Sequence, residues 1–114
     1  MATVYDSVTW VIPTPASTTG YAGPKLPNAV TAVEISSYTV GGTSVAFNIE
    51  ERSACNSAGT DMLASDQTAD ADGTSATSFS NGGLAANCFP FLAVTTVTGA
   101  VTTLAVTMAY SYSV

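Results

Sequence analysis

The sequence predicts an all-β protein, a single β-sandwich of the jelly-roll type with an extended N-terminal arm. Three observations carry this prediction. Apolar residues recur with period two in every strongly apolar stretch, which is typical of strands with one buried and one wet face. Turn residues separate these stretches at spacings of roughly 8–12 residues, enough for about seven or eight strands. No long stretch shows helical periodicity.

The final stretch, residues 101–114, shows the alternation most clearly. Its large apolar side chains share one parity: Leu104, Val106, Met108, Tyr110 and Tyr112. Hydroxyl residues and two alanines occupy the other parity: Thr103, Thr107, Ser111, Ser113, Ala105 and Ala109. We therefore expect a strand whose even-numbered side chains lie in the core.

Residues 1–28 are predicted to form an N-terminal strand followed by a Pro/Gly-rich arm. Apolar residues of the first part share a parity, although Asp6 interrupts it and Val11 spoils the opposite parity: Val4, Val8, Trp10 and Ile12. Residues 13–28 contain prolines and a Ser/Thr/Gly cluster that break regular structure. The apolar side chains must be buried somewhere. The segment therefore either returns to the sandwich as a strand or packs on a partner chain.

Residues 29–114 are predicted to form the β-sandwich domain. The clearest internal strands cover residues 30–40, with Val33 and Ile35 expected inward, and residues 44–52. The Gly41-Gly42 turn signal separates them. Shorter strands are expected over residues 61–67, 74–80 and 89–97, and a bend or a short turn of helix over residues 84–87. Pro90 favours an edge or the beginning of a strand.

Composition indicates a protein that makes surfaces rather than one that catalyses a reaction. Of its 114 residues only 9% are charged, whereas about a quarter is usual, so hydroxyl groups carry solubility. The formal net charge is −6, and Lys25 and Arg52 are the only basic residues. We therefore expect no binding of nucleic acid or of an anionic membrane. We also expect no export signal and no membrane helix, because no apolar run is long enough.

We predict no catalytic residue, cofactor or metal. The chain has no histidine that could activate a serine or a cysteine. Glu50 and Glu51 are adjacent on a strand and so point to opposite faces. The run Asp70-Ala71-Asp72-Gly73 resembles part of a calcium loop, but Thr68 and Phe79 would then occupy its first and last ligand positions. We interpret it as a turn in which Asp caps the backbone.

The two cysteines, Cys55 and Cys88, lie far apart in the sequence and match no metal-binding spacing. Cys88 opens an apolar run, which predicts a buried free thiol. A disulfide between the two cysteines is the alternative.

We expect contacts with other chains at two places. The N-terminal segment is the predicted anchoring element through these residues: Val4, Tyr5, Val8, Trp10 and Ile12. Deleting residues 1–12 should then abolish attachment or self-association and leave the sandwich folded. Arg52, the only arginine, is predicted to bind a carboxylate of its own chain or of a neighbouring subunit.

From residue 30 onward, the order of strands and turns is similar to that of small β-sandwich structural proteins of tailed-bacteriophage virions, a class that includes head decorations, head fibres and fibre tips. The resemblance rests on VTAVEI (30–35), SVAFNIEER (44–52), AGTDML (58–63), ADGTS (71–75), LAVT (92–95) and the ending from Gly99 to LAVTMAY (104–110). This class typically has an alternating strand that ends in a polar N-I-x-x step, a Gly-Thr turn and a closing L-x-V-T strand. The match covers about three quarters of the chain and leaves out the first 28 residues.

The resemblance implies a non-enzymatic virion protein that forms homo-oligomers, often trimers, and it carries over no catalytic residue. The role we expect is a capsid decoration or cement protein that binds other virion proteins, above all the capsid protein. Two other roles stay open. A receptor- or glycan-binding tip of a phage head or tail fibre would use the same fold, and an aromatic cluster at loop ends would favour it. A pilin-like surface subunit would donate its N-terminal strand to a neighbour.

Overall fold

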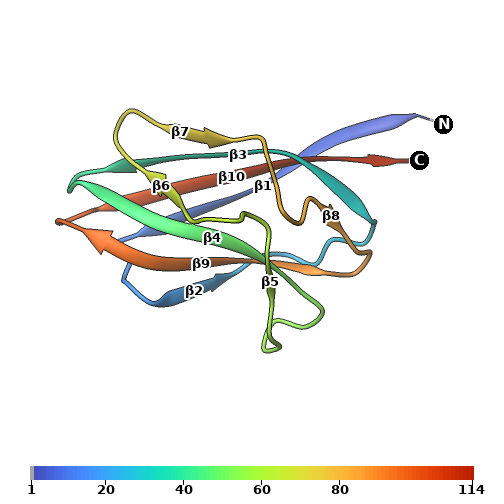
Figure 1. Ribbon diagram of the computed structural model, residues 1–114, viewed down its shortest axis with the longest axis horizontal. Helices are drawn as coiled ribbons and strands as arrows, with labels where there is room; N and C mark the ends of the chain where they lie inside the picture. Colours follow the sequence, from blue (N-terminus) through green and yellow to red (C-terminus); the bar gives the residue numbers. More distant parts are fainter. Residues whose placement is uncertain (1) are drawn as a thin grey trace.

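The computed structural model describes residues 2–114 and shows two antiparallel sheets packed against each other (Figure 1). Every regular element within this range is a strand, so the predicted all-β sandwich is confirmed. The strands are β1 (Thr3–Pro13), β2 (Thr19–Ala22), β3 (Val30–Val40), β4 (Ser44–Arg52), β5 (Thr60–Asp61), β6 (Gln67–Ala69), β7 (Thr74–Ala76), β8 (Gly83–Leu84), β9 (Phe89–Thr98) and β10 (Thr103–Ser113).

Along the sequence, the chain passes back and forth between the two sheets. Sheet A has the order β1-β10-β3-β7, with β8 also paired to β3. Sheet B has the order β2-β9-β4-β5, with β6 also paired to β4. The consecutive strands β1 and β2, β3 and β4, and β9 and β10 therefore hold matching positions in the two orders. At the β3–β4 passage Gly41 and Gly42 both have positive φ, which confirms the predicted turn.

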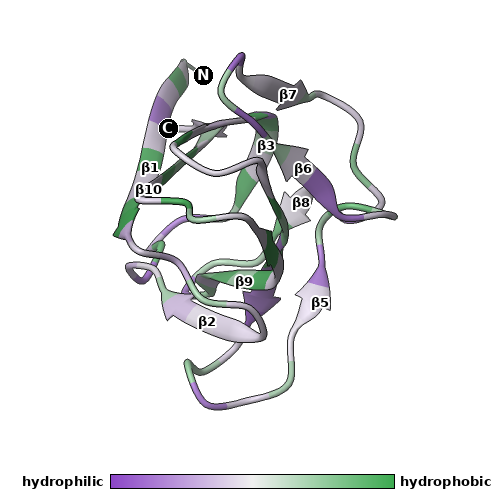
Figure 2. Cartoon of the chain, turned by 90° about the vertical axis from the view of Figure 1, so that its left-hand side faces the viewer, coloured by the Kyte–Doolittle hydropathy of each residue, from purple (hydrophilic) through white to green (hydrophobic). Residues whose placement is uncertain are grey.

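The core lies between the sheets and consists of the inward parity of the long strands. Its largest fully buried side chains are Ile35, Val45, Phe47, Ile49, Met62, Leu92, Leu104, Val106 and Met108. Burying each such side chain contributes roughly 1.5–3 kcal/mol before the entropy of ordering is counted. The even-numbered face of β10 is buried from Leu104 to Tyr110, as the alternation predicts. Figure 2 shows hydrophobic and hydrophilic bands along β1.

The N-terminal segment returns to its own sandwich, which is the first of the two arrangements left open by the sequence. As strand β1 it pairs with β10 along its whole length, from Thr3 opposite Ser113 to Pro13 opposite Thr103. Trp10 is buried in the core, and its indole Nε1 donates a hydrogen bond to the Ala22 carbonyl at 3.2 Å. This side chain therefore joins the edge of sheet A to the edge of sheet B.

The Pro/Gly-rich stretch packs against the sandwich instead of leaving it as an arm. Strand β2 pairs with β9, and the buried Leu26 donates its N–H to the Cys88 carbonyl at 2.9 Å. Glycine is required at two points of this path. A Cβ on Gly20 would meet the Phe91 ring, and one on Gly23 would meet the Pro90 carbonyl. The absence of side chains there allows the close approach.

Two predicted strands differ in the structure: residues 61–67 form no continuous strand, and the strand expected at residues 74–80 is limited to β7. Between β5 and β6 the chain leaves the sheet, because residues 62–66 cross over β4 and hydrogen-bond to Asn48. After Ala76 the chain turns away from β3, and Ser80 donates its N–H to the Met62 carbonyl at 2.9 Å. The bend expected at residues 84–87 follows the two-residue strand β8, and residues 86–87 form a turn. Pro90 lies at the beginning of β9, as predicted.

Val33 was predicted to point inward, and this prediction is wrong. The side chain is 42% exposed. The pairing of β3 with β10 shifts register between Ala109, opposite Glu34, and Tyr110, opposite Ala32. Val33 is the extra residue of this bulge, which turns it outward and restores the inward direction at Ile35.

Candidate interaction surfaces

The acidic turn of residues 70–73 is stabilised by hydrogen bonds between the Asp70 carboxylate and backbone N–H groups of the turn. The Asp70 carboxylate Oδ1 accepts the N–H groups of Asp72 and Gly73, both at 3.1 Å. Gly73 has φ +88°, which glycine adopts readily. Across residues 2–114 no three His, Cys, Asp or Glu side chains gather in a way that could hold a metal ion. Asp70 is therefore a turn-capping residue, as the sequence indicated.

The outer face of sheet A, called here the A face, is nearly free of charge. It is formed by the outward parity of the three long strands: Tyr5, Ser7, Thr9 and Val11 on β1, Thr103, Ala105, Thr107, Ala109 and Ser111 on β10, and Val33, Glu34, Ser36, Tyr38 and Val40 on β3. Glu34 is the only ionisable group among them apart from the two tyrosines. Thr9 and Thr107 share a hydrogen bond between their hydroxyls at 2.9 Å.

Exposed apolar side chains concentrate on the A face. Within residues 2–114, five of the six large hydrophobic residues that are exposed belong to it: Tyr5, Val11, Val33, Tyr38 and Val40. Tyr5 is 73% exposed and Val11 is 64% exposed. The register places Val11, Ala105 and Tyr38 side by side in one row across three strands. Such a row of neighbouring apolar side chains marks an interaction surface more often than isolated exposed residues do.

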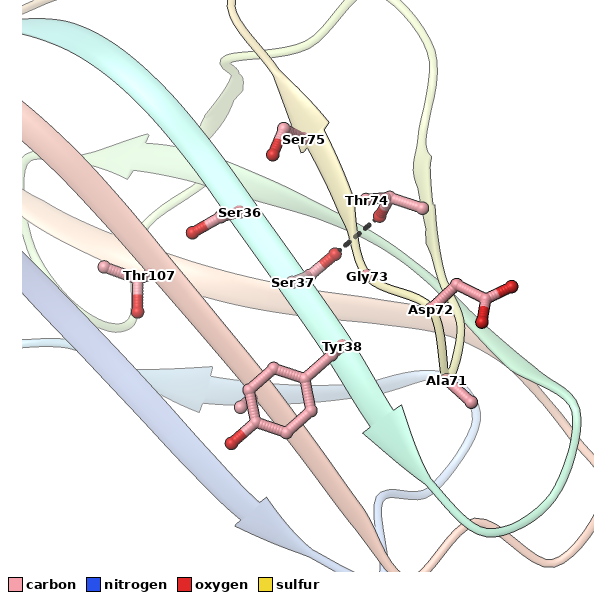
Figure 3. Close-up of a pocket in the computed structure, with 10 residues that line it drawn as sticks. Ser36, Ser37, Tyr38, Ala71, Asp72, Gly73, Thr74, Ser75 and Thr107 are labelled. Atoms are coloured by element: carbon pink, nitrogen blue, oxygen red, sulfur yellow. Dashed lines mark hydrogen bonds between the residues drawn. The ribbon is translucent and has the colours of Figure 1, made fainter.

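A groove of about 520 Å³ borders the A face where β7 lies against β3 (Figure 3). Its lining includes Ser36, Tyr38, Asp72, Ser75 and Thr107. Figure 3 shows the Tyr38 ring on the β10 side of β3 and the Asp72 carboxylate on the other side. The groove thus combines one exposed aromatic ring with hydroxyl groups and one carboxylate.

Buried hydrogen bonds fix the wall of this groove. Ser37 and Thr74 join β3 to β7 through their hydroxyls at 2.8 Å. Gln67 on β6 donates its Nε2 amide to both hydroxyls at 3.1 Å and to the Ile35 carbonyl at 3.2 Å. A side chain of sheet B therefore ties together two strands of sheet A.

Strand β1 leaves a long backbone edge exposed. Its 11 residues pair with β10 without a register shift. At the two ends of this pairing, Thr14 N–H donates to the Thr102 carbonyl at 2.9 Å and Val114 N–H donates to the Ala2 carbonyl at 3.0 Å. Hydrogen-bonded pairs recur at every second residue, so the even-numbered residues bond to β10. The backbone groups of the odd-numbered residues consequently face away from the sheet.

Residues 62–66 cover the part of the outer face of sheet B around Asn48, whereas the A face carries exposed apolar side chains. Asn48 points outward from β4 but is buried beneath residues 62–66. Its Oδ1 accepts the N–H groups of Leu63 at 3.1 Å and Ile49 at 2.9 Å, and its Nδ2 donates to the Leu63 carbonyl at 3.0 Å. Asp66 accepts the Thr95 hydroxyl at 2.6 Å. This network fixes the segment over the sheet.

Arg52 is held within its own chain. Its guanidinium Nη2 lies 2.8 Å from the Glu50 Oε1, and Nη1 donates to the Cys55 carbonyl at 2.6 Å. Its Cζ also lies 3.5 Å from the centre of the Phe91 ring. Of the two partners predicted for Arg52, the structure therefore shows a carboxylate of the same chain.

The residues predicted to anchor the N-terminal segment separate into two groups. Trp10 is buried, and Val8 and Ile12 pack against the core, so all three contribute to the fold of this chain. Val4 is half-buried. Tyr5 alone of the five is strongly exposed. Sequence reasoning missed Val11, Tyr38 and Val40, although apolar residues on the outward parity of long strands were a usable signal.

The structure contains both cysteines as free thiols, with Cys55 exposed and Cys88 buried. This confirms the buried free thiol predicted for Cys88. Burial, followed by the nearby Glu51 carboxylate, raises the pKa of the Cys88 thiol. Burial is likewise the largest cause of the raised pKa of Asp61, and the Glu50 and Asp66 carboxylates add to it.

Comparison with known proteins identifies a fold and no family. No protein-family model matches the chain, and no curated protein has a significantly similar sequence. Among solved structures, a chain of the "Cyanophage Pam1 capsid asymmetric unit" is similar, with a TM-score of 0.51 and 11% identity. The similarity covers 97% of this chain and 85% of the phage chain. Residues 2–114 contain no helix that could span a membrane.

Proposed function

We propose that this protein is a non-enzymatic structural component of a phage virion, a capsid decoration or cement protein that binds the capsid protein through its A face. The observation that carries the proposal is the concentration of exposed apolar side chains on one nearly uncharged sheet face. Burying such a face contributes about 25 cal/mol per Å² of apolar surface. It costs little desolvation of charge, because Glu34 is its only carboxylate.

Two further observations support this proposal. The sandwich is similar over most of its length to a chain of a phage capsid, and the same fold would suit a protein that coats a particle. The hydroxyl side chains between the apolar residues, such as Thr9 and Thr107, are short and uncharged, so they add no charge that docking would have to desolvate.

The test is the binding of the purified chain to particles assembled without it. Tyr38→Asp and Val40→Asp each place a carboxylate on the A face. We expect each to weaken particle binding about tenfold or more, because docking would bury an unpaired charge. Thr96→Asp on the exposed part of β9 in sheet B is the matched control and should bind like the wild type. Equal binding by all three variants would contradict the proposed docking face.

A second candidate function, a glycan-binding tip of a head or tail fibre, is favoured by the groove beside Tyr38. The groove lining offers the exposed Tyr38 ring for stacking and the Ser36 and Ser75 hydroxyls for hydrogen bonds to a neutral sugar, with the Asp72 carboxylate on the other side of β3. Glycan-array binding that is lost in both Tyr38→Ala and Asp72→Asn would support it. Particle binding should be insensitive to Asp72→Asn, which separates the two candidates.

A further inference from the structure

We propose that two copies of this chain pair antiparallel through β1, with Val8 facing its counterpart, so that sheet A continues from one copy into the next. This inference goes beyond the proposed docking to the capsid protein and names a surface for the self-association that the sequence led us to expect. The A faces of the two copies would then form one continuous face.

The edge of β1 is the one suited to such pairing. It is 11 residues long and has no register shift, whereas β2 at the matching edge of sheet B has four residues and β7 at the other edge of sheet A has three. The outward N–H groups of its odd-numbered residues, from Thr3 to Val11, have no strand beside them. Pro13 is its only proline and stands at its end. Unpaired edges of this length readily accept another strand.

A second copy of β1 fits this edge in one register better than in others. Residues that face each other across a sheet must point to the same side, so only alternate registers are possible. Placing residue 3 opposite residue 13 pairs the strand over its full length. It also places Tyr5 opposite Val11 of the other copy, and Ser7 opposite Thr9. The two most exposed apolar side chains of β1 would thus meet twice, once on each side of the two-fold axis.

Asp6 opposes this pairing without preventing it. Its Oδ1 accepts the outward N–H of Ser7 at 2.8 Å, and it is the one carboxylate on β1. An acidic group at a sheet edge discourages unwanted pairing. In the proposed register Asp6 lies opposite Trp10 of the other copy rather than opposite a second Asp6. Pairing therefore requires Ser7 to exchange its carboxylate acceptor for the Thr9 carbonyl of the other copy.

Sedimentation equilibrium of the purified chain tests the association. The Cys55→Ser variant in reductant excludes disulfide-linked dimers, because Cys55 is an exposed thiol. We expect a reversible monomer–dimer equilibrium that tightens with salt, since each copy carries a formal charge of −6. Asp6→Ala frees the Ser7 N–H and should tighten the dimer roughly five- to tenfold. A chain that stays monomeric in both forms, or that forms trimers unaffected by Asp6→Ala, would overturn the inference.

A charge pair tests the register. Tyr5→Lys and Val11→Asp should each weaken the dimer, and the double variant should recover it, because the new ammonium and carboxylate face each other in both halves. Tyr5→Lys combined with Thr9→Asp is the matched control, which would recover only in a register shifted by two residues. Circular dichroism melts verify that every variant folds.

The outcome separates this inference from the proposed function. If the chain is monomeric yet binds particles through Tyr38 and Val40, only the β1 pairing is overturned. If the dimer forms but particles are not bound, the docking function is overturned and the pairing stands. A dimer that is indifferent to Tyr5 and Val11 substitutions would place the contact elsewhere and would also contradict the pairing.

Discussion

The two sheets have outer faces of opposite character. On sheet B the chain folds residues 62–66 over β4 and secures them with the hydrogen bonds of Asn48 and Asp66. On sheet A the corresponding surface carries Tyr5, Val11, Tyr38 and Val40 with no chain segment over them. Residues 62–66 therefore cover part of the outer face of sheet B, whereas the outer face of sheet A exposes apolar side chains to solvent.

This contrast identifies which features are structural and which are available for binding. Polar groups on the B side are occupied by partners of the same chain, as Arg52 is by Glu50 and Phe91. Apolar groups on the A side contribute little to folding because they remain exposed. Substitutions on the B side should therefore change stability, whereas those on the A side should change association. The following predictions test that division, from the largest expected effect to the smallest.

Trp10→Ala should cost about 3–5 kcal/mol of unfolding free energy, the usual cost of truncating a buried aromatic side chain. Trp10 is 5% exposed and links β1 to the Ala22 carbonyl of β2. Urea denaturation followed by circular dichroism measures the change. Tyr5→Ala on the same strand is the control and should alter stability by about 0.5 kcal/mol or less. Similar effects of the two substitutions would mean that β1 does not belong to the core.

Asn48→Ala should cost about 2–4 kcal/mol, because it leaves the buried N–H groups of Leu63 and Ile49 without an acceptor. The same denaturation assay reports it. Ser36→Ala on the A face serves as the control, because its hydroxyl has no hydrogen-bond partner among the described residues. If Asn48→Ala were as mild as Ser36→Ala, the cover over sheet B would not depend on this amide.

Arg52→Ala should cost about 1 kcal/mol, since the ion pair with Glu50 is partly exposed and the contact with Phe91 adds a modest amount. Particle binding should be unchanged, because Arg52 lies on sheet B. Loss of binding with unchanged stability would instead indicate that Arg52 contacts another subunit.

Alkylation should distinguish the two cysteines. Cys55 is exposed and should react in the native state, whereas Cys88 should react only after unfolding, because burial raises its pKa and excludes the reagent. The folded chain holds the Cys88 proton more tightly than the unfolded chain does. Stability should therefore fall as pH rises through the ordinary thiol range. Mass spectrometry of the labelled protein distinguishes the two sites, and rapid labelling of native Cys88 would contradict its burial.

The sequence predicted the parts of the fold that depend on local periodicity. The alternation in residues 103–113 and 44–52 identified β10 and β4, because one side of each strand packs on the core and the other does not. Asp70 and the Gly41-Gly42 pair likewise revealed turns, since their chemistry acts over a few residues.

Features that depend on distant residues could not be predicted in this way. The outward position of Val33 follows from a register shift against β10, about seventy residues later in the chain. The burial of Asn48 follows from residues 62–66, for which the local pattern predicted a strand rather than a segment over β4. For the candidate surface, Tyr5 was identified, but Val11 was treated as an irregularity of the alternation. Only the pairing of β10 with β1 on one side and with β3 on the other places it in one row with Tyr38.

The pairing of β1 with β10 has a consequence for how the chain reaches its native state. Strand β1 forms its ladder of hydrogen bonds with β10. During synthesis Trp10 and its neighbours therefore lack this partner until residues 103–113 have left the ribosome. Closing so long a loop is entropically costly, and high contact order slows folding. Folding should therefore be slow and all-or-none, and a nascent chain stalled before β10 should expose β1 to premature aggregation.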